Sequence, residues 1–213
     1  MNILLWNCNN GINKPKQIDY FKSFQCDLAV IPELKEGNIP SLEPDCAVWI
    51  TNNHSNPNPK GLGVLTFNGW QLDELPRDED MEIYIPLRVS DPSHSFNLLA
   101  VWNFYWACKG GRFKDVKGES ALEWSAIRHY KTLFNDPSII IGDWNFGPTF
   151  SQEAFVRLER ELNESGLTSL YHLRYELSTR ETSHSTFKTT RGNLHHIDHM
   201  LSQLLLVAGH RVL

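Results

Sequence analysis

The chain has 213 residues, of which 41% are hydrophobic and 21% charged, and its formal net charge at pH 7 is −5. This length and composition are typical of a globular protein with ample core, and we expect a single domain over residues 1–213. The negative charge argues against a broad basic surface, and hence against a protein that only binds nucleic acid. It is compatible with an enzyme whose acidic pocket is neutralised by a bound metal.

Nothing in the sequence predicts export or membrane insertion. No apolar run reaches the length needed to span a membrane. The first ten residues, MNILLWNCNN, have neither the basic region nor the cleavage site of a secretory signal. The cysteines lie far apart without a Cys-x-x-Cys pair, which favours buried free thiols in a reducing compartment: Cys8, Cys26, Cys46 and Cys108. We therefore expect a cytoplasmic protein that does not contact a membrane.

In chain order, the predicted strands of the first half are short apolar runs that end at turn-forming residues. We expect them at 2–6, 27–31, 46–51, 62–67, 82–89 and 96–102. Pro32 and Glu33 are expected to close the second strand, and the segments expected to be loops or connections are 37–44, 52–60 and 73–80. Because the later strands follow one another without helices, we predict an antiparallel or mixed sheet.

Three segments have the apolar periodicity or the boundary residues of helices. They are 15–24, 119–134 and a helix that begins after the N-cap candidate Ser151 and ends at Gly166. Short strands are expected after them at 168–173, 185–188 and 196–202. Alternation in the last strand places His196 and Asp198 on one face and His199 on the other.

The most informative stretch is 139–145, with the sequence IIIGDWN. Its three isoleucines predict a fully buried strand, and Gly142 permits an abrupt turn after them. Asp143 and Asn145 then stand just past the carboxyl end of a strand, where open α/β sheets bind their ligands. A carboxylate can hold a hard cation or accept a proton from water, and a carboxamide can hydrogen-bond a phosphate oxygen. Asx turns that only cap a loop are the alternative for such residues.

Other polar residues also follow predicted strands: Asn7, Glu33 and Asp198. Their order resembles that of the endonuclease/exonuclease/phosphatase superfamily. The matching segments are WNCNNG at 6–11, DLAVIPE at 27–33, KGLGVLTF at 60–67, IIIGDWN at 139–145, and STFK followed by HHIDHMLS within 185–202. The resemblance covers nearly the whole chain. It implies a four-layer α/β sandwich, in which two mixed β-sheets pack face to face with helices outside.

The resemblance also implies a function. We expect a Mg²⁺- or Mn²⁺-dependent phosphodiester hydrolase, in particular a nuclease that cleaves DNA or RNA by metal-assisted in-line attack of water. Glu33 would be the principal metal ligand, with Asn7 beside it and Asp143 binding the metal or activating the attacking water. Asn145 would hold a phosphate oxygen. Asp198 would orient a catalytic histidine.

Residues that contact the substrate are less clearly marked. Many superfamily members place a histidine or tyrosine that reaches the phosphate after the strand at 96–102, and this chain offers Trp102, Asn103 or Tyr105 there. Lys188 and Arg191 lie near Asp198 and could meet substrate phosphates, with a solvated turn as the alternative. The basic segment 108–118 is expected to be a solvated loop.

The sequence departs from the superfamily pattern after Asp198. The closing strand of the superfamily begins with a Ser-Asp-His motif that supplies the catalytic histidine, and no such motif follows here up to Leu213. His210 is a weak candidate for a substitute, because its neighbours in GHRVL do not match the motif. We therefore expect a truncated chain, a partner chain that completes the site, or a catalytically impaired member that binds nucleic acid or a protein. The missing strand would leave a sheet edge unpaired, through which copies of the chain could associate.

Overall fold

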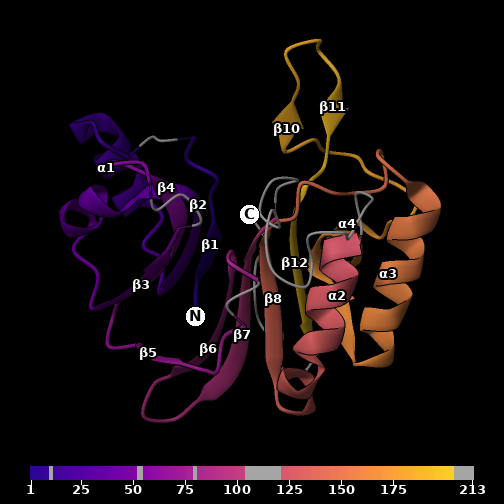
Figure 1. Ribbon diagram of the computed structural model, residues 1–213, viewed down its shortest axis with the longest axis horizontal. Coiled ribbons are helices and arrows are strands. Elements are labelled where there is room, and N and C mark those ends of the chain that lie inside the picture. The colour runs from indigo at the N-terminus through magenta and orange to yellow at the C-terminus, as the bar shows by residue number, and fades with distance from the viewer. Residues whose placement is uncertain (10–11, 52–54, 79–80, 104–120, 204–213) are drawn as a thin grey trace.

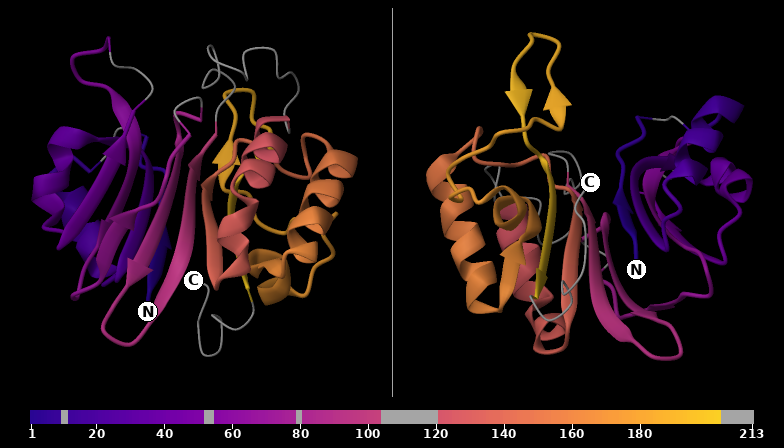
Figure 2. Two further views of the ribbon diagram at one scale, coloured as in Figure 1. Left: turned by 60° about the horizontal axis from the view of Figure 1, so that its bottom comes forward. Right: turned by 180° about the vertical axis from the view of Figure 1, so that it is seen from behind.

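The computed structural model describes residues 1–9, 12–51, 55–78, 81–103 and 121–203. Two mixed β-sheets lie face to face, with helices on the outside of both (Figures 1 and 2). The first sheet has four strands in the order β1 (Ile3–Leu5), β2 (Leu28–Lys35), β4 (Lys60–Thr66) and β3 (Cys46–Ile50). The helix α1 (Pro15–Ser23) and the 3₁₀ helix η1 (Glu36–Leu42) cover its outer face. Within the described residues β1 is an edge strand, paired only with β2.

The second sheet has six strands in the order β5 (Gln71–Glu74), β6 (Tyr84–Ser90), β7 (Ser95–Trp102), β8 (Ser138–Asp143), β12 (Asp198–Gln203) and β9 (Leu167–Ser169). The pair β7–β8 is parallel, and the other pairs of this sheet are antiparallel. Its outer face carries α2 (Ala121–His129), the 3₁₀ helix η3 (Lys131–Asn135), α3 (Gln152–Glu164) and α4 (Leu170–Tyr175). The predicted four-layer sandwich of two mixed sheets is confirmed.

A separate two-stranded hairpin stands apart from both sheets. It consists of β10 (Phe187–Lys188) and β11 (Leu194–His195), and it projects from the body beside the start of β12 (Figures 1 and 2). The backbone amide of Thr189 donates to the oxygen of Asn193 at 2.8 Å, which closes the turn between the two strands.

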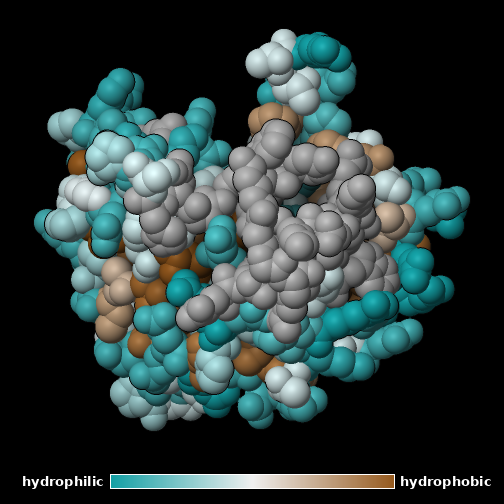
Figure 3. All heavy atoms as spheres, in the orientation of Figure 1, coloured by the Kyte–Doolittle hydropathy of each residue, from teal (hydrophilic) through white to brown (hydrophobic). Residues whose placement is uncertain are grey.

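The apolar core is divided by the first sheet. Val30 and Val64 of that sheet pack against Leu98 and Ile141 of the second sheet in the space between them. On the other side, Ile31 of β2 packs with Phe21 of α1 and Leu42 of η1. Alternate residues of β2 therefore supply both cores, which explains why its sequence reads as a continuous apolar run. On the face shown in Figure 3, hydrophilic residues predominate outside the grey region.

Several predicted elements differ from those observed. The strand β2 continues through Pro32 and Glu33 to Lys35, the expected loop at 37–44 is mostly the helix η1, and the expected connection at 73–80 begins within the edge strand β5. The expected strand at 168–173 divides into β9 and the helix α4, in which Ser169 caps the backbone amide of His172. The expected helix at 119–134 is the shorter helix α2 followed by η3.

Gly142 marks the closest approach of two strands. A Cβ atom at this position would lie 1.8 Å from the backbone oxygen of Val101 in the neighbouring strand β7. Only glycine therefore permits the parallel pairing that brings Trp102 opposite Asp143.

The described residues include free thiols at Cys8, Cys26 and Cys46. Cys8 and Cys26 are buried, as expected, and Cys46 is partly exposed. Among the helices that the structure describes, none combines the length and the apolar character needed to cross a membrane.

A cluster of buried polar side chains lies between β12 and the helices α3 and α4. His172 Nδ1 lies 3.2 Å from Glu159 Oε1, and His199 Nε2 donates to the backbone oxygen of Phe146 at 2.8 Å. The rings of His196 and His199 are 5.0 Å apart. The prediction that His196 and His199 lie on opposite faces of a strand is wrong. The strand β12 begins at Asp198, so strand alternation does not extend to His196. Burial lowers the pKa of His196 to about 4 and lowers the pKa of His199 well below its usual value.

Acidification is expected to destabilise the protein through His196. Its pKa falls from 6.5 in the unfolded chain to about 4 in the folded protein, so only the unfolded chain gains this proton as the pH falls through that range. The stability contributed by the neutral ring is present above pH 6.5 and is lost as the pH falls toward 4. When the pH is lowered from about 7 to about 5, the free energy of unfolding should fall in both proteins. We expect the fall to be about 2 kcal/mol smaller in His196→Phe than in the wild type, as measured by urea unfolding.

Carboxyl groups with raised pKa values act in the opposite direction, because they contribute stability that is lost as the pH rises. They are present in both proteins, so the difference between the proteins isolates His196. Equal losses in the wild type and in His196→Phe would contradict the assignment.

Candidate active site at the joined ends of the two sheets

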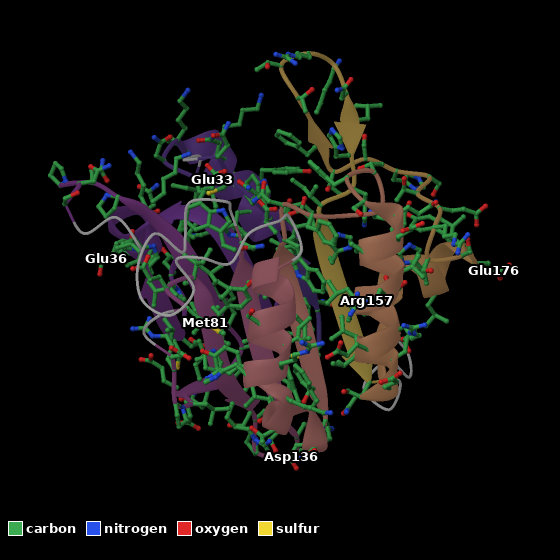
Figure 4. The ribbon with its side chains drawn as sticks, turned by 45° about the vertical axis from the view of Figure 1, so that its right-hand side comes forward. Glu33, Glu36, Met81, Asp136, Arg157 and Glu176 are labelled. Atoms are coloured by element: carbon green, nitrogen blue, oxygen red, sulfur yellow. The ribbon has the colours of Figure 1, made fainter. Side chains whose placement is uncertain are left out.

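Glu33 occupies a β-bulge in β2. Pro32 pairs with Leu62 and Leu34 pairs with Gly61, which leaves Glu33 as an extra residue outside the ladder. Its φ is 63°, in the left-handed region that side chains other than glycine adopt at a cost. Such bulges re-aim a side chain next to functional sites. Glu33 lies at the end of the molecule from which the β10–β11 hairpin projects (Figure 4).

Asn7 links the two sheets. The amides of Trp6 and Cys8 donate to the oxygens of Val30 and Pro32 at 3.1 Å and 3.3 Å, which fixes Asn7 beside the bulge. Its side-chain nitrogen donates to Glu33 Oε1 at 3.2 Å and to Asp143 Oδ2 at 2.8 Å. A residue of the first sheet thus bridges carboxylates that belong to different sheets.

The turn after β8 is held by hydrogen bonds to its neighbours. The backbone amide of Asn145 donates to Asp143 Oδ1 at 2.9 Å, which forms an Asx turn. The side-chain nitrogen of Asn145 donates to the backbone oxygen of Asn103 at 2.6 Å, and the Asn103 amide donates to the backbone oxygen of Asp143 at 2.8 Å. Asn145 has a φ of 47° and is exposed, whereas Asp143 is only 2% exposed. The turn therefore holds one buried and one accessible polar side chain side by side.

Asp198 lies directly opposite Asp143 in the β8–β12 ladder. Its Oδ1 atom is buried and has no hydrogen-bond partner among the described residues. Burial raises the pKa of Asp198 to about 6, against a hydrogen bond with Thr186. Burial and then the charge of Asp198 raise the pKa of Asp143 to about 7, against hydrogen bonds from the Asn145 amide and the Asn7 side chain.

Lys60 is a site residue that sequence reasoning missed. Its ammonium group forms an ion pair with Glu33 Oε2. The sequence gives only a weak indication of this role, namely that Lys60 begins the KGLGVLTF segment. Lys60 reaches Glu33 because of the register between β2 and β4, in which Lys60 pairs with Lys35. With Glu33, Asp143 and Asp198 all ionised, this one ammonium would leave two negative charges, and a divalent cation would neutralise them.

The structure resembles several solved structures along nearly its whole length. The endonuclease domain of TRAS1, a telomere-specific non-LTR retrotransposon, matches with a TM-score of 0.65 and 13% identity, over 96% of this chain and 85% of that chain. The 3′-5′ exonuclease NExo from Neisseria meningitidis matches with a TM-score of 0.63 and 16% identity, over 99% of this chain and 90% of that chain. The catalytic domain of human nocturnin with bound sulfate matches with a TM-score of 0.57 and 16% identity, over 93% and 80% of the two chains.

The chain shares the fold of these solved structures, which is the four-layer sandwich implied by its resemblance to the endonuclease/exonuclease/phosphatase superfamily. No model of a protein family matches the sequence, and no curated protein matches it. At identities of 13–16% the structural likeness shows the fold alone, and a shared fold does not determine an activity.

Within this superfamily fold, the predicted site residues fall into three groups. Asn7, Glu33 and Asp143 are joined by hydrogen bonds, and Asn145 and Asp198 adjoin them. Asn103 is buried beside the turn after β8, where its side-chain nitrogen donates to the backbone oxygen of Trp144. Lys188 and Arg191 lie elsewhere, exposed on the hairpin and its turn. Tyr105 and His210 lie outside the described residues.

The superfamily fold implies a divalent metal, and the residues at the site fit one. Glu33 and Asp143 offer carboxylate oxygens on either side of the Asn7 amide. Mg²⁺ typically takes one or two carboxylates and completes its coordination with water and substrate phosphates. Among the described residues no three His, Cys, Asp or Glu side chains are grouped to hold a metal by themselves. The donor set therefore suits a hard cation that keeps much of its water shell and competes with Lys60 for Glu33.

Proposed function

We propose that the protein is a Mg²⁺- or Mn²⁺-dependent phosphodiester hydrolase that acts on nucleic acid. The observation that carries the proposal is the bridge from Asn7 to both Glu33 and Asp143, which unites the ends of the two sheets. The fold is shared with solved structures of an endonuclease domain and a 3′-5′ exonuclease. A cation held by Glu33 with Asn7 and Asp143 would polarise the phosphoryl group and stabilise the leaving oxygen.

In this proposal Asp143 accepts a proton from the attacking water. Burial raises the pKa of the Asp143 carboxylate, which increases its affinity for a proton. The neighbouring charge of Asp198 maintains that basicity, and the Asn7 side chain fixes the orientation of the Asp143 carboxylate. Asn145 is exposed beside Asp143, where its amide can contact a phosphate oxygen of the substrate.

The test is hydrolysis of single-stranded DNA, duplex DNA, RNA and bis(p-nitrophenyl) phosphate, with Mg²⁺ or Mn²⁺ and with EDTA. We expect turnover of at least one nucleic acid that requires the metal and stops in EDTA. If nucleic acid binds without turnover and without sensitivity to EDTA, the protein is a binding module and the hydrolase proposal is wrong. Turnover that persists in EDTA would also refute it.

A further inference from the structure

Three rings form a stack on the β10–β11 hairpin. Phe187 and His195 are cross-strand partners, so their side chains lie on one face of the hairpin. Their rings are stacked with centroids 6.4 Å apart, and the ring of Phe150 also stacks on His195, with centroids 4.4 Å apart. Thr149 Oγ1 lies within hydrogen-bond distance of His195 Nδ1, at 2.8 Å. We call Phe150, His195 and Phe187 the aromatic stack.

Two short segments of the chain connect the aromatic stack to the candidate active site. Phe150 follows Asn145 by five residues, and His195 precedes Asp198 by three, so the Cα atoms of His195 and Asp198 are at most about 11 Å apart. The amides of Ile197 and Asp198 both donate to Thr186 Oγ1, at 3.1 Å and 3.3 Å, which anchors the base of the hairpin at Asp198. A molecule bound at the carboxylates therefore passes close to the aromatic stack.

The apolar surface of this region is exposed. Phe150 is 38% exposed and Phe187 is 45% exposed. Leu194, which pairs with Lys188 and so lies on the other face of the hairpin, is 57% exposed. These are three of the six large hydrophobic side chains that stand exposed among the described residues. Figure 3 shows hydrophobic atoms at the base of the hairpin, over β10. Such a concentration of exposed apolar side chains marks a binding surface.

The same hairpin carries positive charge. Lys188 and Arg191 are exposed, and neither forms an ion pair with a described residue. In a chain with a net charge of −5, these two cations favour an anionic ligand at the hairpin. A ligand with flat apolar groups and phosphates complements both features of this surface.

We propose that the aromatic stack binds unpaired bases of a single-stranded nucleic acid whose backbone enters the carboxylate site. Every base has a π face that an aromatic ring can stack on, but in a duplex those faces are covered by the adjacent base pairs. Arg191 in the turn and Lys188 on the other face of the hairpin are then available to phosphates of the strand as it passes the hairpin. This proposal rests on the proposed function and adds to it the class of substrate.

The test compares oligonucleotides that share a backbone and differ in their bases. Binding is measured by fluorescence anisotropy in EDTA, with single strands of about 12 nucleotides, an abasic strand of equal length and a duplex. We expect the single strand to bind tighter than both others. Stacking contributes about 1–3 kcal/mol per base, so Phe187→Ala is expected to weaken binding of the single strand by about 5- to 150-fold. Phe187→Trp is expected to retain the affinity.

Tyr20→Ala is the matched control, because Tyr20 is 59% exposed and lies on α1, away from the hairpin. It is expected to leave binding unchanged. Equal affinity for the single strand and the abasic strand, preference for the duplex, or no effect of Phe187→Ala would each overturn the proposal. Hydrolysis of bis(p-nitrophenyl) phosphate with Mn²⁺ keeps the two proposals distinguishable. Turnover without base-dependent binding refutes only the aromatic-stack proposal, whereas base-dependent binding without any turnover refutes only the hydrolase proposal.

Discussion

Replacing Asp143 with asparagine is expected to lower kcat for phosphodiester hydrolysis by about 10²- to 10⁴-fold, the range that a positioned general base contributes. The amide keeps the shape of the side chain but cannot accept the proton of the attacking water. The fold should persist, because the substitution removes a buried negative charge whose pKa is raised by burial and by Asp198. We expect the unfolding free energy at pH 8 to stay within about 1 kcal/mol of the wild type.

Glu33→Gln provides the companion measurement. The carboxylate of Glu33 is the proposed metal ligand, so its loss is expected to weaken Mn²⁺ binding by at least about tenfold, measured by electron paramagnetic resonance. Asp19→Asn on the exposed surface of α1 is the control for both variants and should change neither turnover nor metal binding. Turnover of Asp143→Asn within a factor of about three of the wild type would refute the role of Asp143 as the base.

Gly142→Ala is expected to destabilise the protein by more than about 3 kcal/mol, or to prevent its folding. The new Cβ would lie 1.8 Å from the backbone oxygen of Val101, and neither strand can move without breaking the β7–β8 ladder. Gly37→Ala is the matched control, since a Cβ there meets nothing within 4 Å and the change should stay within about 0.5 kcal/mol.

Urea unfolding followed by circular dichroism measures both glycine variants. A Gly142→Ala protein within about 1 kcal/mol of the wild type would show that β8 lies farther from β7 than the structure places it. If the variant is insoluble while Gly37→Ala folds normally, the expected destabilisation is supported.

The central strands could be predicted because each is a local apolar run. β8 is buried along its whole length, as its three consecutive isoleucines predict. β5 could not be predicted in this way, because QLDE has one apolar residue and becomes a strand only by pairing with β6. α4 was mistaken for a strand because a short apolar run does not distinguish a buried strand from a helix. In α4 the Ser169 side chain accepts a hydrogen bond from the His172 amide, which favours the helix.

The candidate site was predictable in its residue types and not in its contacts. Asn7, Glu33 and Asp143 each follow an apolar run, so their places at strand ends could be inferred. The bulge that displaces Glu33 from the ladder leaves no signal in the sequence, because it depends on the register with β4. The same register determines that Lys60 reaches Glu33, and a register is a property of two strands together.

The bulge places Glu33 outside the strand pairing that builds the first sheet. Pro32 and Leu34 pair with Leu62 and Gly61, which are adjacent in β4, so the ladder closes without counting Glu33. Ile31 and Leu34 both pack in the core beneath α1, and they would stand two residues apart if Glu33 were deleted. The deletion would therefore leave a regular strand with its apolar side chains in phase. Deletion of a single in-frame codon could therefore remove the proposed metal ligand from a descendant of this gene and leave the fold intact.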